Sequence, residues 1–319
     1  MTRRALVTGA AGFVGQHVTQ LLLADGWAVT GASAALPGGG ALSPAERDAV
    51  DWRTLDLRDG DRIGPLLDAV RPDAIVHLAG IAHLVTAAGD PALTRAVNTG
   101  ICERLLGELR PRRAAGDIDP VVLVVGSAEQ YGPHDPAEMP LREEAEQRPV
   151  SVYAQAKAEQ EALALAAHRD HGARVVCTRS FNHGGPGQHR DFLLPSLVRR
   201  VRALKAAGAR ELPLGNTAPV RDFLHVRDVA RAYVALLGGG AGGTVYNVAS
   251  GIGRDIGAIA RSVCAAAGLD AELVTDAALV RPVEVPVLVG DASRLRTATG
   301  WAPALSFDDL IADVMHAAT

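Results

Sequence analysis

The stretch Ala5-Leu6-Val7-Thr8-Gly9-Ala10-Ala11-Gly12-Phe13-Val14-Gly15 decides the fold of this chain. Its apolar start predicts a buried first strand, and the glycines stand where that strand turns into a helix carrying Val18 and Leu22. Glycines at such a turn let a pyrophosphate approach the helix N-terminus, whose unpaired N–H groups and dipole favour an anion. An ordinary strand-to-helix turn is the alternative, because a glycine pattern alone is weak support. We expect a dinucleotide to be bound by Gly9, Gly12, Phe13, Val14 and Gly15.

Strand-like apolar runs alternate with helix-forming stretches along the rest of the chain. The strand-like runs are 27–32, 74–78, 121–125, 174–178 and 245–248, and the helical stretches lie near 91–110, 151–171 and 226–237. This alternation predicts an α/β fold, a doubly wound parallel Rossmann sheet covered by helices on both faces. Residues 1–180 and 222–250 are expected to form this dinucleotide-binding domain. Residues 181–221 and 251–319 are expected to form a smaller α/β lobe over the carboxyl ends of the strands, where such sheets bind ligands.

A second pattern, Tyr153-Ala-Gln-Ala-Lys157, lies in the predicted helix 151–171. Its spacing puts the phenol and the ammonium on one helix face. An isolated tyrosine has a pKa of about 10, and a nearby cation, joined by oxidised nicotinamide, lowers that pKa. Tyr153 can then exchange a proton with a substrate oxygen while hydride moves to or from the cofactor. Ser127, after the apolar run 121–125, can bond the same oxygen. A tyrosine and a lysine four residues apart usually belong to a solvent-exposed helix face. Here Ser127 and the glycine motif favour a catalytic role.

The residues after the second strand leave the cofactor open between NAD(H) and NADP(H). Dinucleotide sites often place there an acid for the ribose hydroxyls or an arginine for a 2′-phosphate. This chain has Ser33 and Ala34 instead. Further along, Asp56 and Leu57 are expected beside the adenine, with helix capping as the alternative role for Asp56.

Composition narrows the class of protein. The 319 residues suggest roughly two domains, their 48% hydrophobic content supplies a sizeable core, and the formal charge of −4 argues against a general nucleic-acid surface. The sequence contains neither a signal-like apolar region nor a membrane-spanning run, so we expect a soluble cytoplasmic protein without membrane partners. Cys102, Cys177 and Cys264 are expected to be reduced structural thiols, and no metal-ligand spacing stands out.

These motifs together resemble the extended short-chain dehydrogenase/reductase family over nearly the whole chain. The shared motifs are 8–15, His77-Leu78-Ala79-Gly80, Asn98, 126–132, the Tyr153/Lys157 pair and Arg221-Asp222-Phe223. Three further stretches, 181–188, 246–251 and 281–290, are similar to the branch containing GDP-4-keto-6-deoxy-mannose reductase and GDP-mannose 4,6-dehydratase.

The resemblance implies a catalytic set and two binding sets. Ser127, Tyr153 and Lys157 would be catalytic, and Glu129 stands where the dehydratases hold an additional base. The cofactor site would add Ser33, Asp56, Leu57, Leu78, Ala79, Gly80, Asn98, Tyr153 and Lys157. A GDP-sugar or other nucleotide sugar would be bound by His83, Ser127, Asn182, Arg221, Arg281 and Glu284. Arginines can neutralise a diphosphate and a carboxylate can accept from ribose hydroxyls.

Two reactions stay open within the branch. The form of the glycine segment favours a reductase that converts GDP-4-keto-6-deoxy-D-mannose to GDP-D-rhamnose with NADH or NADPH, whereas Glu129 suits a 4,6-dehydratase as well. Ala82, His83 and Ala128 depart from the reductase pattern, so another nucleotide-linked hexose is an alternative substrate. A non-catalytic NAD(P)-sensing or scaffold protein is the alternative of another class. The resemblance also implies a homodimer formed by the helices near 91–110 and 151–171, whose apolar residues equally suit the core.

Overall fold

The computed structural model describes residues 2–280 and 285–317. Its largest sheet has seven parallel strands: β1 (Arg4–Thr8), β2 (Ala28–Ser33), β3 (Asp51–Thr54), β4 (Ala74–His77), β5 (Val121–Ser127), β6 (Val175–Ser180) and β10 (Thr244–Val248). They are ordered β10-β6-β5-β4-β1-β2-β3, so the chain changes direction across the sheet between β1 and β4. Ligands of doubly wound sheets bind outside the strand ends at that change. The predicted Rossmann fold class is confirmed.

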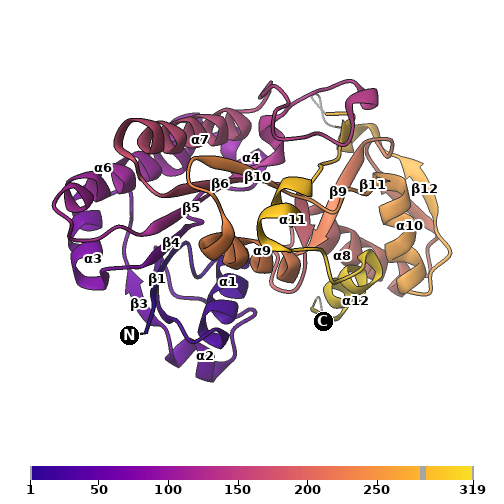
Figure 1. Ribbon diagram of the computed structural model, residues 1–319. Coiled ribbons are helices and arrows are strands. Elements are labelled where there is room, and N and C mark those ends of the chain that lie inside the picture. Colours follow the sequence, from indigo (N-terminus) through magenta and orange to yellow (C-terminus); the bar gives the residue numbers. More distant parts are fainter. Residues whose placement is uncertain (1, 281–284, 318–319) are drawn as a thin grey trace.

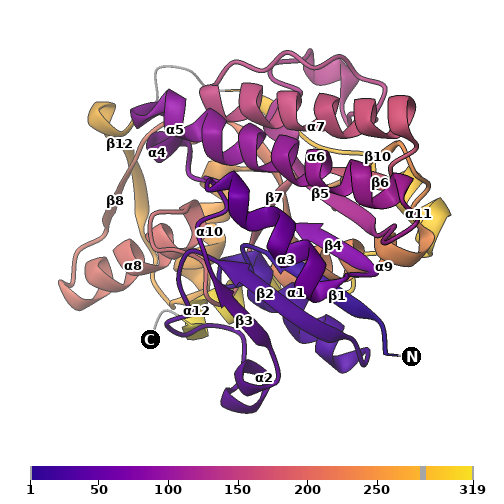
Figure 2. The same ribbon diagram turned by 90° about the vertical axis from the view of Figure 1, so that its left-hand side faces the viewer.

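Helices cover both faces of this sheet. Residues Ala5, Leu6 and Val7 of β1 are all fully buried, because successive side chains point to opposite faces and both faces carry a core. One face packs against α1 (Phe13–Ala24), α9 (Val226–Gly239) and α11 (Ser293–Thr299). The other packs against α3 (Ile63–Val70), α6 (Ile101–Ala114) and α7 (Val152–His171), which lie side by side in Figure 2.

Short helices connect these layers. They are α2 (Pro44–Asp48), α4 (Leu84–Gly89) and α5 (Pro91–Arg95). A π-helical turn, Ala96–Gly100, joins α5 to α6, so the helical stretch expected near 91–110 is interrupted there. Ile101 and Leu105 of α6 are almost fully buried against the sheet, which makes them core residues.

A smaller lobe stands at one end of the main sheet (Figure 1). Its four-stranded sheet comprises β7 (Asn182–Gly184), β9 (Val220–His225), β11 (Gly253–Asp255) and β13 (Val287–Leu288), and a separate parallel pair comprises β8 (Glu211–Leu214) and β12 (Glu272–Thr275). Helices α8 (Leu193–Ala206), α10 (Ile256–Ala266) and α12 (Phe307–Ala317) complete it. The lobe has its own core, which includes Leu197, Phe223, Ile259 and Leu310.

The strand pairing differs from the expected domain limits in two places. The limit between 221 and 222 falls inside β9, which pairs with β7, β11 and β13 of the lobe. Helix α11, in the segment 251–319 expected to belong to the lobe, packs on α9 and β10 of the main sheet. An apolar run such as Phe223-Leu224 indicates a buried strand but not the sheet it joins. The division into two domains stays a prediction.

None of the helices within residues 2–280 and 285–317 is long and apolar enough to span a bilayer.

Candidate active site

The glycine turn between β1 and α1 is shaped by close backbone contacts. Gly9 has a φ of +72°, and a Cβ there would lie 2.9 Å from the backbone nitrogen of Ala79. A Cβ at Gly15 would lie 2.3 Å from the carbonyl oxygen of Gly9. Gly12 differs, because it is exposed and a Cβ would meet only that same oxygen, at 3.1 Å. Gly9 and Gly15 therefore shape the turn, and Gly12 leaves its outer side open.

The N-terminus of α1 lies at this open side. Gly12 is its N-cap, and no side chain of the described residues caps it. Helix N-terminal N–H groups attract phosphate, so this turn fits the pyrophosphate of a dinucleotide. Phe13 stacks on His183 of β7, with ring centroids 6.2 Å apart, while Val14 packs against the core of the α1 face. The turn therefore joins the main sheet to the lobe.

Ser33 supports the turn from behind. Its Oγ accepts a hydrogen bond from the backbone N–H of Ala11 at 3.0 Å, and its residue is 9% exposed. The end of β2 thus holds the glycine turn and offers no carboxylate to a ribose. Leu57 is buried in the core of the other face, and Asp56 accepts from the Nε of Arg58 at 2.8 Å. That arginine holds the pKa of Asp56 below its usual value.

The segment after β4 lies against the Gly9 turn. Thr8 Oγ1 accepts from the Ala79 N–H at 3.2 Å, and Asn98 makes two hydrogen bonds with the backbone of Ile81, at 2.7 and 3.0 Å. Asn98 is fully buried and belongs to the π-helical turn, a form that is frequent at functional sites. These contacts hold Leu78, Ala79 and Gly80 in an open strip beside the Gly9 turn.

Ser127 lies at the end of β5, next to the strip that follows β4. Its Oγ accepts from the Glu129 N–H at 3.2 Å and so caps a single 3₁₀ turn, 128–130. Tyr153 lies in the first turn of α7, close enough to Ser127 for the serine hydroxyl to act on the pKa of the phenol. Burial raises the pKa of Tyr153 to about 12, the Ser127 hydrogen bond acts in the opposite direction, and the charge of Glu129 raises it further. Ser127 and Tyr153 therefore lie next to each other, with the charge of Glu129 near the phenol.

Lys157 reaches the same place from the next turn of α7. Its residue is 6% exposed, and Nζ donates to the Val125 carbonyl at 2.8 Å and to Gln160 Oε1 at 2.9 Å. Within residues 2–280 and 285–317 these are its two acceptors, so one N–H is left for a ligand. Burial lowers the pKa of Lys157 to about 8. A Cβ on Gly80 would lie 3.6 Å from Nζ, which places the lysine beside the strip that follows β4.

The predicted substrate residues are spread over the lobe and its border. Asn182 and Arg221 lie on the adjacent strands β7 and β9. His83 begins α4, bonds Thr86 at 3.1 Å and contacts the edge of Phe192, with ring centroids 5.5 Å apart. His83 and Phe192 line a cavity of about 260 Å³ that Asn182 and Arg221 do not line. The predicted residues Arg281 and Glu284 lie outside the described residues.

The sequence analysis did not assign a role to Asp222, the middle residue of the Arg-Asp-Phe motif. Its buried carboxylate accepts from Ser250 N–H, Ser250 Oγ, Gly251 N–H and Gly290 N–H at 2.6–3.3 Å. It therefore ties the segments after β10 and β13 to β9. The sequence signal that could have indicated this role is the aspartate that stands between Arg221 and Phe223 in the motif.

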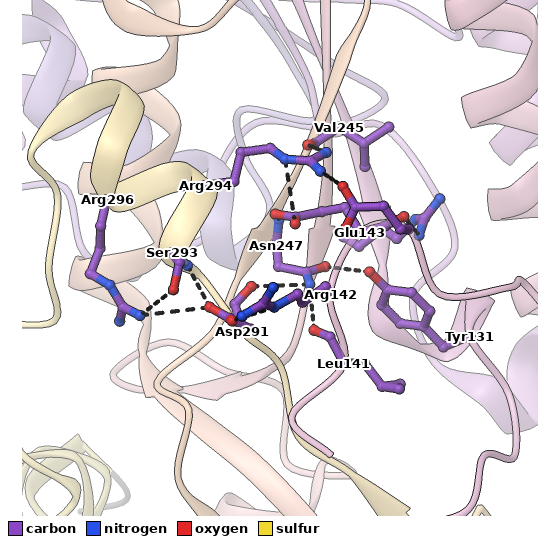
Figure 3. Close-up of polar contacts among 12 residues, drawn as sticks. Tyr131, Leu141, Arg142, Glu143, Val245, Asn247, Asp291, Ser293, Arg294 and Arg296 are labelled. Carbon is purple, nitrogen blue, oxygen red and sulfur yellow. Dashed lines mark hydrogen bonds and ion pairs between the residues drawn. The ribbon is translucent and has the colours of Figure 1, made fainter. Parts of the chain in front are cut away.

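A second group that the sequence analysis missed surrounds Asn247 of β10 (Figure 3). Asn247 accepts from the Tyr131 hydroxyl at 2.7 Å and donates through Nδ2 to the carbonyls of Leu141 and Asp291, at 2.9 and 3.2 Å. Its backbone N–H donates to Glu143 at 2.8 Å. Asn247 thus holds the segment after the Ser127 turn against β10 and the start of α11.

The family model described as GDP-mannose 4,6 dehydratase matches residues 6–314. The chain belongs to the GDP-mannose 4,6-dehydratase family. It is 35% identical to a GDP-6-deoxy-D-mannose reductase of Pseudomonas aeruginosa over 96% of this chain and 94% of the relative. It is 30% identical to a dTDP-glucose 4,6-dehydratase of Streptomyces niveus over 98% and 92%. The solved structure of RMD from Pseudomonas aeruginosa complexed with NADPH matches at a TM-score of 0.82 and 32% identity, covering 99% of both chains.

Membership confirms the predicted resemblance and the class of enzyme. The protein is an NAD(P)-dependent nucleotide-sugar oxidoreductase of the extended short-chain dehydrogenase/reductase type, and the non-catalytic alternative is set aside. The solved structure of RMD from Pseudomonas aeruginosa is complexed with NADPH and that of a Thermus thermophilus UDP-glucose 4-epimerase with NAD, which agrees with the expected NAD(H) or NADP(H) cofactor. Among residues 2–280 and 285–317 no cluster of His, Cys, Asp or Glu could hold a metal ion. The individual site residues stay predictions.

Proposed function

We propose that the protein reduces the C4 ketone of GDP-4-keto-6-deoxy-D-mannose to GDP-D-rhamnose with NADH or NADPH. The observation that carries the proposal is that Ser127 and Tyr153 lie next to each other while Lys157, one helical turn along α7, lies beside Gly80 and donates to the carbonyl of Val125, two residues before Ser127. The similarity to the Pseudomonas aeruginosa GDP-6-deoxy-D-mannose reductase supports this substrate class.

Each catalytic side chain has a definite task in this reaction. Reduced nicotinamide, when bound, supplies a hydride to C4. Ser127 and Tyr153 hydrogen-bond the ketone oxygen, and Tyr153 gives it the proton as the alcohol forms. Ser127 Oγ accepts from Glu129 N–H and keeps its own O–H as a donor for the ketone oxygen. A Tyr153 pKa of about 12 keeps the phenol protonated at neutral pH, as reduction requires.

The cofactor would be held along the edge between β1 and β4. Gly9, Gly12 and Gly15 form the pyrophosphate turn, and the third N–H of Lys157 is available to the nicotinamide ribose. Leu78, Ala79 and Gly80, held by Asn98 and Thr8, would face the remainder of the dinucleotide. Ser33 is neither an acid that would favour NAD(H) nor an arginine that would favour NADP(H), so the test uses both cofactors.

A 4,6-dehydratase is the second candidate, and Glu129 is the observation that favours it. Its charge acts on Tyr153, so the carboxylate lies near the reacting groups. In that cycle C4 is oxidised transiently, Glu129 removes the C5 proton, water leaves from C6 and the hydride returns to the sugar. The family match and the dTDP-glucose 4,6-dehydratase relative agree with this chemistry.

A single assay separates the two reactions. Purified protein is mixed with GDP-4-keto-6-deoxy-mannose and NADH or NADPH, and in parallel with GDP-mannose and NAD⁺ or NADP⁺; nicotinamide absorbance and the sugar nucleotides formed are both followed. Stoichiometric cofactor oxidation with the keto sugar supports the reductase and identifies its cofactor. Conversion of GDP-mannose without net cofactor consumption overturns it in favour of the dehydratase. No turnover of either sugar overturns both substrate assignments.

A further inference from the structure

Helix α7 carries a buried carboxylate on the same face as the proposed catalytic pair. Tyr153, Lys157 and Glu161 follow one another at intervals of four residues, which places them along one side of a helix. Tyr153 lies beside Ser127 and Lys157 beside Gly80, whereas the Glu161 side chain, two turns along from Tyr153, is 3% exposed. The proposed mechanism does not use this acid.

Glu161 is fully engaged by three partners. Arg179 of β6 donates to both carboxylate oxygens, through Nε at 2.9 Å and Nη2 at 2.7 Å. Gln130 Nε2 donates to Oε2 at 3.0 Å, and Gln147 Nε2 donates to Oε1 at 2.7 Å. A buried charge is tolerated when it is paired and its remaining lone pairs are satisfied. The Glu161–Arg179 pair meets that condition and forms a fixed point between α7 and β6.

Gln130 connects this fixed point to the serine. Its Oε1 accepts from the Ser127 N–H at 2.8 Å, which sets the orientation of the amide group. Its Nε2 therefore points to Glu161, and also to Gln147 Oε1 at 3.2 Å. Gly126 permits this close packing, because a Cβ there would lie 2.4 Å from Gln130 Oε1.

Tyr131, the residue that follows the 128–130 turn, is held by other contacts. The Tyr131 ring lies under the guanidinium of Arg179, 4.7 Å from its centroid, and the Tyr131 hydroxyl bonds Asn247 as Figure 3 shows. The turn that carries Ser127 is thus attached to α7 through Gln130 and to β10 through Tyr131. The attachment through Gln130 reaches Glu161, on the helix that carries Tyr153, by hydrogen bonds alone, whereas the Tyr131 ring reaches that helix by way of Arg179.

We propose that Gln130 is a positioning residue, which uses the Glu161–Arg179 pair as an anchor to fix Ser127 relative to Tyr153. Since Glu161 and Tyr153 belong to one helix, a bond from Glu161 through Gln130 to Ser127 sets the separation of the two groups that bind the ketone oxygen. The inference rests on the proposed function in that Ser127 and Tyr153 act on one substrate atom.

Gln147 provides a matched control. It is also a neutral amide, and it bonds both Glu161 and Gln130, but within the part of the chain that the structure describes it makes no hydrogen bond with Ser127. Gln130→Met and Gln147→Met each remove an amide from the same anchor. Only the first removes the acceptor of the Ser127 N–H.

The first experiment measures kcat and KM of both variants with the nucleotide sugar that the wild-type enzyme converts. Misplacing a reacting group by about 1 Å costs on the order of 100-fold in rate. We expect kcat of Gln130→Met to fall at least about tenfold with KM for the cofactor within about twofold of wild type. Gln147→Met should keep kcat within about threefold, even if both variants lose thermal stability. Equal losses of kcat, or a loss confined to KM, would overturn the proposal.

A spectroscopic experiment tests the same inference without turnover. The Tyr153 phenol is titrated by ultraviolet absorbance with oxidised cofactor bound, as the difference between each protein and its Tyr153→Phe counterpart. Because the Ser127 hydrogen bond lowers the Tyr153 pKa, Gln130→Met should raise the midpoint and Gln147→Met should leave it unchanged. Unaltered midpoints in both variants contradict the inference.

These readouts separate failure of the inference from failure of the proposed function. If wild-type protein converts neither sugar, the proposed function fails while the titration still decides the role of Gln130. If Gln130→Met does not fold, Gln130→Asn replaces it with Gln147→Asn as control. The shorter amide reaches Ser127 or Glu161 but not both, so the same direction of change is expected. Equal behaviour of the two asparagine variants would likewise overturn the inference.

Discussion

Burial shifts Tyr153 and Lys157 in opposite directions for one reason. Removing either side chain from water disfavours its charged form, so the pKa of the phenol rises to about 12 and that of the ammonium falls to about 8. The protein without ligands therefore holds a neutral phenol at neutral pH. Changes of charge nearby, such as binding of an oxidised cofactor, then act on groups that solvent screens weakly.

The lysine shift predicts a specific pH dependence of stability. Its folded pKa of about 8 lies below the unfolded value of about 10.4. Between these values the unfolded state binds more protons, so the free energy of unfolding contributed by Lys157 rises with pH across this window, by up to about 3 kcal/mol. Relative to Lys157→Met, the wild type should gain stability between pH 7 and pH 10. Urea unfolding of both proteins measures this, and a pH-independent difference would contradict it.

Replacing the tyrosine tests its role as the proton donor. Tyr153→Phe should lower kcat by about 100-fold to 10,000-fold, the usual contribution of a positioned acid. Cofactor affinity, measured by nucleotide fluorescence, should change little because the glycine turn is untouched. Tyr246→Phe is the control, since the Tyr246 hydroxyl accepts from Ala241 N–H. Retention of wild-type kcat by Tyr153→Phe would remove this residue from the mechanism.

Local spacing made some residues predictable and others not. Tyr153 and Lys157 could be proposed from the sequence because they lie one helical turn apart, and Ser127 because it ends an apolar strand. Gln130 and Glu161 were not, since 31 positions separate the amide from its partner. The same holds for Glu161 and Arg179, which are 18 positions apart. Such pairs follow from how strands and helices stack, which one sequence does not reveal.

At the scale of elements, two glycines of the turn between β1 and α1 differ in the space that surrounds them. Gly15→Ala would place a methyl group 2.3 Å from a backbone oxygen, and such overpacking costs about 1–3 kcal/mol. Gly12→Ala meets the same oxygen at 3.1 Å and should change stability by only about 1 kcal/mol or less. Its methyl group nevertheless occupies the open side of the turn.

We therefore expect Gly12→Ala to weaken NADPH or NADH binding at least about tenfold with little change in Tm, a loss of about 1.4 kcal/mol. Gly15→Ala should lower both the affinity for the cofactor and the Tm. Thermal unfolding without cofactor and fluorescence titration with it are the two measurements. Undiminished cofactor affinity in Gly12→Ala would show that the pyrophosphate lies elsewhere.

Element types were predicted better than element partners. Apolar periodicity predicted β1, β4, β5, β6 and β10, together with α1, α7 and α9. The π-helical turn was not predicted, because no residue pattern in 96–100 distinguishes it from an α-helix. The membership of β9 in the lobe also could not be read from its apolar residues, since a strand buried in either sheet has the same composition.

At the scale of the whole molecule, Asn247 links the main sheet to two distant segments. Its Nδ2 donates to carbonyl groups of Leu141 and Asp291. Asn247→Asp would face both carbonyls with acceptors and bury a charge, which costs about 3 kcal/mol or more. We expect a lower Tm and faster proteolysis within residues 132–150, compared with Asn216→Asp as an exposed control. Equal protease resistance of the Asn247 variant and the wild type would refute this link.

The homodimer stays a prediction at this scale. Ile101 and Leu105 face the sheet, so a dimer through α6 and α7 would use other side chains of these helices. Light scattering at working concentration should give twice the mass of 33.2 kDa. A monomer mass would refute the dimer.

The bonds from Glu161 to Gln130 and Arg179 also limit how this chain can be recombined with its relatives. A crossover between 130 and 161, or between 161 and 179, would combine an anchor from one parent with partners from another. An insertion of one residue between Tyr153 and Glu161 would turn the acid by about 100° around the helix axis. Chimaeric enzymes that exchange residues 126–180 as one block should retain turnover, whereas exchanges that divide this block should fold and lose rate.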